Sequence, residues 1–277
     1  LYVSLPSDGK FYDEGVIQFD RNNELAVYPM TASDELLARS PDALLNGDSV
    51  YKAIASCVPG VIKPLVLTAK DAQTLLTAIR CATYGETQEI IQVCPECRAE
   101  NKYEMNLRNV LASIEPYTEF ETFKTDNGLE IVITPITYDA TLATTRFTFE
   151  NAQMLANMSS LANEEQTLEQ QTAQMEIFRN SFAKMATLNL KILTESIQSI
   201  TIKSSAEGTQ DTVVKDKEHI AEYLRNCDSK TSKQIEETVT TYNNSLATEQ
   251  VEAVCQECEH EWQSPLEFDP VQFFTGS

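Results

Sequence analysis

The chain has 277 residues, of which 42% are hydrophobic and 23% are charged, a composition typical of a globular protein with a sizeable core. Its 42 acidic and 21 basic residues give a net charge of −21, which disfavours nucleic acid as a partner because phosphate is also negative. No apolar run approaches the length that crosses a membrane, so we expect a soluble protein with no membrane partner. The chain begins at Leu1 rather than Met, and we expect that residues precede it.

Residues 1–86 are predicted to form an α+β region that opens with an arm and a hairpin. Residues 5–12 are rich in turn formers, which predicts an extended N-terminal arm. Two β-like stretches, residues 16–19 and 25–28, flank the polar residues 20–23. This pattern predicts a hairpin.

Short helices are predicted in the rest of this region. Thr31 is suited to cap a first helix, a following helix is expected to end at Gly47, and the next covers residues 49–57. Residues 68–71 resemble a capping box for a longer helix. Gly85 is the natural end of that helix.

Two Cys-x-x-Cys knuckles are the most informative feature of the chain. Each follows an apolar, β-like stretch and leads into a polar stretch that returns to apolar residues, as the halves of a zinc ribbon do. Two thiolates on each knuckle supply the four ligands of a tetrahedral ion. We therefore predict a structural Zn²⁺ site made by Cys94, Cys97, Cys255 and Cys258.

The predicted zinc ribbon is discontinuous, because it combines residues 87–108 with residues 250–277. Closing a loop of about 160 residues costs on the order of 4 to 5 kcal/mol. Structural zinc sites contribute about 10 to 16 kcal/mol at neutral pH, so one ion can offset that closure. Four thiolates leave no open position for water or substrate, so the ion is expected to organise the fold rather than to catalyse a reaction.

Three other states of these cysteines stay open. They could be free thiols, or they could form a redox dithiol, although Cys94 begins no convincing helix as that chemistry requires. Disulfides are a third state, which the lack of a recognisable signal peptide disfavours. Cys57, Cys81 and Cys227 are interpreted as unpaired, buried, small hydrophobic residues.

Two further regions lie between the knuckles. Residues 109–136 are predicted to form a β-hairpin region, because Asn127-Gly128 supplies the positive φ of a tight turn between two β-like stretches. Residues 137–249 are predicted to be α-rich. The predicted fold class is therefore α+β, with the zinc ribbon joining the two halves of the chain.

The α-rich region begins with residues 139–197, which contain neither proline nor glycine and predict a long helix. Its large apolar residues recur at helical spacing: Leu161, Leu168, Met175, Phe178, Phe182, Met185, Ile192 and Leu193. This face either packs within an α-helical region or forms a seam for a partner or for oligomerisation, and both interpretations stay open. A weaker hairpin and two shorter helices are expected after it.

A catalytic site is not indicated by the sequence. His219 lies on a predicted helix and is interpreted as a surface or core-edge residue, while His260 follows Cys258 in a knuckle that already has its ligands. Nucleotide-binding, hydrolase and metalloprotease motifs are missing. We therefore expect no enzyme and no small-molecule substrate.

Several short motifs follow one another in a defined order along nearly the whole chain. They are Leu5-Pro6-Ser7-x-Gly9-Lys10-Phe11-Tyr12, Pro29-Met30-Thr31-Ala32, Asp34-Glu35-Leu36-Leu37, Leu44-Leu45-Asn46-Gly47, Ala78-Ile79-Arg80-x-Ala82-Thr83-Tyr84-Gly85 and Cys94-Pro95-x-Cys97, with the second knuckle before Phe273-Phe274. This order resembles the baseplate hub subunit family of bacteriophage T4-type, contractile-tailed phages. The family's cysteine pairs match the same four cysteines.

The resemblance implies a structural protein of the virion tail baseplate, assembled in the host cytoplasm through contacts with other baseplate and tail proteins. Two alternatives stay open: a transient assembly chaperone that the virion does not retain, and a cellular zinc-ribbon adaptor. Residues 5–12 and 268–274 are candidate docking segments, unless they tuck against the protein's own core.

Overall fold

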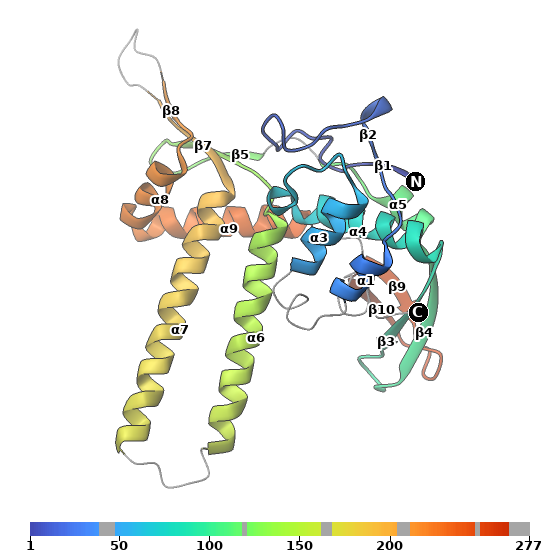
Figure 1. Cartoon of the computed structure of the whole chain (residues 1–277). Helices are drawn as coiled ribbons and strands as arrows, with labels where there is room; N and C mark the ends of the chain where they lie inside the picture. The colour runs from blue at the N-terminus through green and yellow to red at the C-terminus, as the bar shows by residue number, and fades with distance from the viewer. Residues whose placement is uncertain (39–47, 118–120, 162–167, 204–210, 247–249, 266–277) are drawn as a thin grey trace. The chain divides into compact units, whose positions relative to one another are not determined.

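The computed structural model describes residues 1–38, 48–117, 121–161, 168–203, 211–246 and 250–265. The chain forms two compact units (Figure 1), and each is described by itself. Unit 1 comprises Leu1–Thr118 and Leu246–Ser277, and unit 2 comprises Glu119–Ser245. Helices and small antiparallel sheets occur together, so the predicted α+β class is confirmed. The finer division into four regions stays a prediction.

Unit 1 combines small two-stranded sheets with short helices. Its elements are β1 (Tyr2–Ser4), a 3₁₀ turn (Arg21–Asn23), β2 (Glu24–Ala26), α1 (Ala32–Ala38), α3 (Asp48–Cys57), a 3₁₀ turn (Pro64–Val66), α4 (Ala69–Tyr84), β3 (Thr87–Val93), β4 (Glu100–Asn106), α5 (Leu107–Ser113), β9 (Gln250–Val254) and β10 (Glu261–Pro265). The pairs are β1 with β2, β3 with β4 and β9 with β10. The predicted hairpins around both cysteine knuckles are therefore present.

Helix α4 is the centre of unit 1, and its side chains are buried on nearly all sides. The predicted capping box begins it, since the Thr68 hydroxyl accepts a hydrogen bond of 3.3 Å from the Asp71 N–H. Gly85 ends it with a φ of 97°, which favours glycine. The capping signals in the sequence thus fix both ends of the central helix.

The N-terminal arm lies against α4, which supports the alternative that it tucks against the protein's own core. Leu5 and Ser7 are buried, and the Ser7 N–H donates to Asp71 Oδ1 at 3.0 Å. The Tyr12 hydroxyl donates to the other carboxylate oxygen of Asp71 and accepts from the Thr68 N–H at 2.9 Å. Because a buried carboxylate needs donors, the arm belongs to the core of unit 1.

The first predicted hairpin is wrong, because β2 pairs with β1 rather than with residues 16–19. The register places Val3 opposite Leu25, and both are buried. The Gln18 N–H instead donates to the Gly60 carbonyl at 2.7 Å. A Cβ at Gly60 would lie 2.5 Å from the Gln18 oxygen, so glycine permits this close approach.

Unit 2 is a four-stranded antiparallel sheet with four helices among its described residues. Its elements are β5 (Glu121–Lys124), β6 (Glu130–Ile133), α6 (Tyr138–Leu161), α7 (Leu168–Glu195), β7 (Ile197–Ile202), β8 (Thr212–Val214), α8 (Lys217–Asn226) and α9 (Ser229–Ser245), with the strand order β5-β6-β7-β8. The predicted Asn127-Gly128 hairpin is β5–β6. Buried side chains from the sheet, α8 and α9 form its core: Ile131, Ile133, Ile197, Ile200, Ile220, Leu224, Ile235, Val239 and Tyr242.

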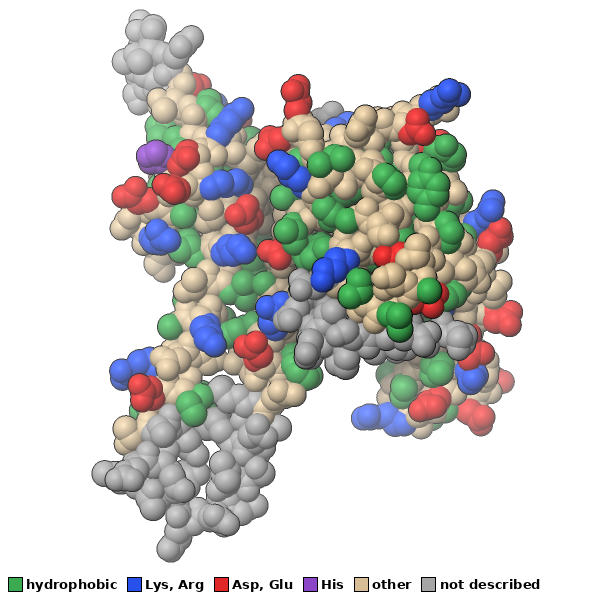
Figure 2. Space-filling model, in the orientation of Figure 1, with side chains coloured by type: hydrophobic (Ala, Val, Ile, Leu, Met, Phe, Trp, Pro, Cys, Tyr) green, Lys and Arg blue, Asp and Glu red, His purple; other side chains and the backbone are tan. Residues whose placement is uncertain are grey.

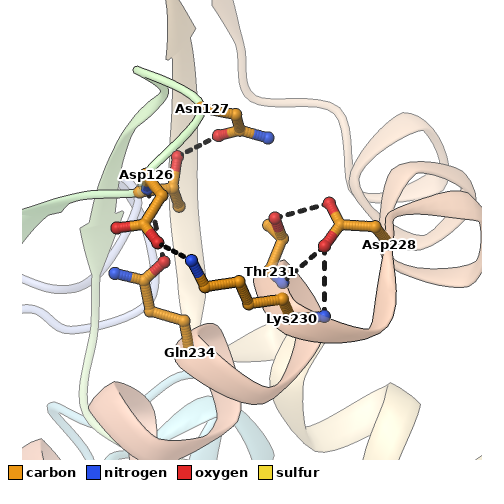
Figure 3. Close-up of polar contacts among 7 residues, drawn as sticks. Asp126, Asn127, Asp228, Lys230, Thr231 and Gln234 are labelled. Atoms are coloured by element: carbon orange, nitrogen blue, oxygen red, sulfur yellow. Dashed lines mark hydrogen bonds and ion pairs between the residues drawn. The ribbon is translucent and has the colours of Figure 1, made fainter.

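The turn between β5 and β6 is fixed to the start of α9 by polar contacts (Figure 3). Lys230 Nζ lies 2.6 Å from Asp126 Oδ2, and the Asp126 N–H donates to Gln234 Oε1 at 3.4 Å. Asp228 caps the helix, accepting from the N–H and the hydroxyl of Thr231 at 3.0 and 2.7 Å. The sheet and α9 are thereby held together.

The predicted long helix is two helices, α6 and α7, which lie side by side and antiparallel within unit 2 (Figure 1). No proline or glycine marks the end of either helix. At the end of α7, Lys217 Nζ donates to the carbonyls of Thr194 and Glu195, both at 3.1 Å. Such a cation is favourable at a helix C-terminus, where carbonyls have no intrahelical partner.

Two predicted features lie outside the described residues: the helix that ends at Gly47 and the segment at residues 268–274. Among the residues that the structure describes, none of the helices combines the length and hydropathy needed to cross a bilayer.

Candidate metal site

The two cysteine knuckles of unit 1 have the same backbone hydrogen bonds. In the first, the Cys94 N–H donates to the Ala99 carbonyl at 2.9 Å and the Arg98 N–H donates to the Cys94 carbonyl at 3.0 Å. In the second, the Cys255 N–H donates to the His260 carbonyl at 2.9 Å and the Glu259 N–H donates to the Cys255 carbonyl at 3.1 Å. Each hairpin therefore turns its Cys-x-x-Cys segment in the same way.

The residue after the second cysteine of each knuckle has a left-handed backbone. Arg98 has a φ of 64° and Glu259 has a φ of 58°, a conformation that is uncommon for non-glycine residues. Such a conformation persists only where the surrounding structure determines it. Its occurrence at matching positions indicates that the two knuckles have the same backbone conformation.

The knuckles bring all four predicted ligands together. The sulfur atoms of Cys94, Cys97, Cys255 and Cys258 all lie within 4.8 Å of one another. Cys94 Sγ is 3.7 Å from Cys258 Sγ, and Cys97 Sγ is 3.5 Å from Cys255 Sγ. Tetrahedral zinc with Zn–S bonds of about 2.3 Å separates its sulfurs by about 3.8 Å. The cluster can therefore hold a metal ion, and its size suits zinc.

These thiols are free and unpaired with one another, so the disulfide alternative has no support among the described residues. Burial is unequal: Cys94 and Cys255 are buried, whereas Cys97 and Cys258 are exposed. The first cysteine of each knuckle thus faces the protein and the second faces solvent. A redox dithiol is disfavoured as well, since both pairs lie in turns between strands rather than at the start of a helix.

Backbone donors influence the charge of the cluster. Burial raises the pKa of the Cys255 thiol, but the backbone N–H groups of Cys258 and Glu257 outweigh it and lower this pKa to about 6. The His260 N–H lowers the pKa of Cys258, but the Cys97 thiol and burial outweigh it and raise this pKa to about 12. Backbone donors in the second knuckle thus favour a thiolate at Cys255, the form in which cysteine binds a metal ion.

Polar side chains connect the two knuckles, and the sequence analysis did not identify them. Asn101 is 1% exposed; its Oδ1 accepts from the Gln256 N–H at 2.8 Å. The Gln256 side chain donates to the Lys102 carbonyl at 3.1 Å, and the Tyr103 hydroxyl donates to the Val254 carbonyl at 2.8 Å. The sequence did hold one sign of these contacts: Asn101 and Tyr103 lie two residues apart on β4, so they share a face of the strand, and inward-facing positions of a strand are usually apolar.

The remaining cysteines and both histidines lie apart from the cluster. Cys57 and Cys81 are buried as predicted, and Cys227 is partly buried. The His260 ring stacks on Trp262, with centroids 6.3 Å apart. His219 is on the surface of α8, where its Nδ1 lies 2.9 Å from Asp216 Oδ1. Neither imidazole joins the four sulfurs in the described part of the chain.

A basic side chain beside the first knuckle could balance the charge of a thiolate centre. Lys102 instead lies 2.9 Å from Glu89 on the neighbouring strand, and this carboxylate raises the pKa of the lysine. The pair is exposed and contributes little to stability. Backbone N–H groups of the second knuckle, by contrast, do favour a thiolate in the cluster.

Comparison with known proteins identifies the family. A search of curated proteins and a search of solved structures each gave no match. The family model described as T4 bacteriophage base plate protein matches residues 3–275, which include both knuckles and both units. The motifs that predicted a phage baseplate protein are thus supported over nearly the whole chain. The chain belongs to the T4 bacteriophage base plate protein family.

Proposed function

We propose that this chain is a structural component of the baseplate hub, acts through protein–protein contacts, and contains one structural Zn²⁺. Family membership supports the baseplate role. The single observation that carries the metal proposal is the clustering of four cysteine sulfurs within 4.8 Å. The ligands would be Cys94, Cys97, Cys255 and Cys258.

Zinc is the metal that this donor set favours in a structural site. Four thiolates in tetrahedral arrangement suit Zn²⁺ or iron, and zinc needs no redox partner. All four coordination positions would be filled by protein, so the ion would have no open position for a substrate. The site therefore supports a structural role, consistent with a family of structural proteins.

The ion would join the end of unit 1 to its beginning. Cys255 and Cys258 lie on β9–β10, and the contacts of Asn101, Gln256 and Tyr103 align this hairpin with β3–β4. These contacts fix orientation, whereas the metal supplies the larger free energy. Loss of the metal would leave β9–β10 attached by a few hydrogen bonds.

The proposed partners are other baseplate and tail proteins, with no nucleic acid, membrane or small-molecule partner. The net charge of −21 opposes binding to nucleic acid. On the face shown in Figure 2, acidic and basic side chains are interspersed. Such a surface suits specific contacts with proteins, where charges set orientation and exclude wrong partners.

The role is tested by asking whether purified contractile tails of the encoding phage contain the chain. Quantitative mass spectrometry should find a fixed copy number per tail. A phage that carries Cys255→Ser should make few complete tails, whereas the matched control Cys227→Ser should assemble normally. Absence from mature tails, combined with a requirement for making them, would favour the assembly-chaperone alternative.

A further inference from the structure

Helix α7 of unit 2 carries a row of large apolar side chains that are exposed. Met175, Phe178, Phe182 and Met185 are 69%, 37%, 62% and 39% exposed. Their spacing of three, four and three residues places them on one narrow stripe of the helix, as in the seam of a coiled coil. We name these four residues the α7 stripe.

Among the side chains that the structure describes, those of the neighbouring helix α6 do not cover the α7 stripe. The Ser181 hydroxyl donates to Asn151 Oδ1 of α6 at 2.5 Å, which marks the face of α7 that is turned toward α6. At about 100° per residue, Phe182 lies about 100° and Phe178 about 60° around the helix from Ser181. The stripe therefore borders that face and points beside α6. Hydrophobic side chains are visible along these two helices in Figure 2.

The core of unit 2 does not reach the stripe. The buried residues of this unit come from the sheet, α8, α9 and the ends of α6 and α7 nearest the sheet. Long, amphipathic helices are stabilised mainly by packing of their apolar face. An apolar stripe that no described residue covers is typical of a contact surface.

The residues of the α7 stripe are arranged symmetrically in sequence about Asn180. Met175 and Met185 each stand five residues from this centre, and Phe178 and Phe182 each stand two residues from it. Farther out in the sequence, Leu168 and Ile192 each stand twelve residues from Asn180. A two-fold interface requires a surface that complements itself, and an antiparallel pair of such helices meets that requirement.

Antiparallel pairing about Asn180 would place like side chains in common layers. Met175 of one copy would face Met185 of the second, and Phe178 would face Phe182. Charges favour the same orientation, because Glu176 of one copy would stand opposite Lys184 of the second. These charges flank the stripe, so they influence orientation and the apolar residues supply the contact.

Electrostatic repulsion between two copies is low along this part of α7. The whole chain carries −21, but residues 175–195 contain three basic and two acidic residues. Two highly acidic molecules approach most easily through a segment that lacks their excess negative charge. We propose that the α7 stripe binds the α7 stripe of a second copy of this chain, antiparallel, with the two-fold axis at Asn180. This proposal is independent of the metal and of the hub role.

The first test measures the mass of the full-length chain by analytical ultracentrifugation over a range of concentrations. The wild type should be a dimer that dissociates on dilution. Phe182→Glu should weaken dimerisation at least tenfold. The matched control is Phe149→Glu: Phe149 is 47% exposed on α6, and it lies about 200° around that helix from Asn151. The control should remain dimeric.

The second test examines the register. Phe178→Lys and Phe182→Glu should each be monomeric alone, because each places a charge against an apolar layer. An equimolar mixture should form a heterodimer, since the introduced lysine of one copy then faces the introduced glutamate of the other.

Circular dichroism should show that every variant is folded. A wild type that stays monomeric at all concentrations, or single variants that dimerise like the wild type, would overturn the proposal. If the equimolar mixture did not form the heterodimer, the antiparallel register would be wrong.

Discussion

Unit 1 and unit 2 are assembled in opposite ways. Unit 1 combines two stretches of chain that are far apart in sequence, and its later stretch meets the earlier one at four cysteines. Unit 2 is one continuous stretch between them, with a core of its own around β6 and β7. A long insertion can thus have a core of its own, while the parts on either side of it meet through residues that are distant in sequence.

Removal of the metal should therefore destabilise part of unit 1 and leave unit 2 unchanged. In the zinc-loaded full chain, a chelator should abolish hydrogen-exchange protection of β9 and β10, because structural zinc contributes about 10 to 16 kcal/mol. Protection of β6 and β7 should not change. The control is chelator saturated with zinc. Unchanged protection of β9–β10 without metal would contradict the proposed role of the ion.

Acid should have the same selective effect. Zinc depresses the folded-state pKa of its ligands below the unfolded value of about 8.5, so the stabilisation is present above that value and is lost as pH falls through the folded-state pKa. Protonation of the four thiolates should therefore release the ion. Zinc release monitored with a chromogenic chelator should coincide with opening of β9–β10. If release left that hairpin protected, the linkage would be wrong.

A substitution in the core of unit 2 should give the reverse pattern. Ile131 is fully buried in β6, so Ile131→Ala should destabilise unit 2 by about 2 to 5 kcal/mol. Urea unfolding followed by hydrogen exchange measures this change. Zinc content should remain that of the wild type. Loss of zinc in this variant would mean that the two units do not fold separately.

A smaller effect is expected at the buried carboxylate of unit 1. Tyr12→Phe removes a hydroxyl that donates to Asp71 and accepts from the Thr68 N–H, so it should cost about 1 to 3 kcal/mol. The matched control is Tyr28→Phe, because Tyr28 is 56% exposed. Equal stability of both variants would show that the N-terminal arm does not depend on this contact.

The cysteine site was the most predictable part of the molecule. Spacing of Cys94 with Cys97 and of Cys255 with Cys258 indicates two knuckles, because the ligand geometry of zinc restricts the sequence between each pair. The contacts of Asn101 and Gln256 were not predictable in the same way. They depend on how two hairpins meet, which no local pattern records.

The fold was predictable where local chemistry decides it. The capping box at Thr68, the turn at Gly128 and the glycine at the end of α4 all occur as predicted. The partner of β2 was missed because it is the distant Tyr2–Ser4, while Gln18 in the nearer stretch is bonded to Gly60 instead. The division between α6 and α7 was missed because neither proline nor glycine marks it.

Whether one zinc ion joins the two knuckles can be measured by X-ray absorption and metal analysis of the purified full chain. We expect one zinc per chain, bound to four sulfur atoms at about 2.3 Å. Cys255→Ser should lose the ion and Cys227→Ser should keep it. Zinc retained in full by Cys255→Ser, or nitrogen or oxygen ligands in the spectrum of the wild type, would show that a single ion does not join the two knuckles.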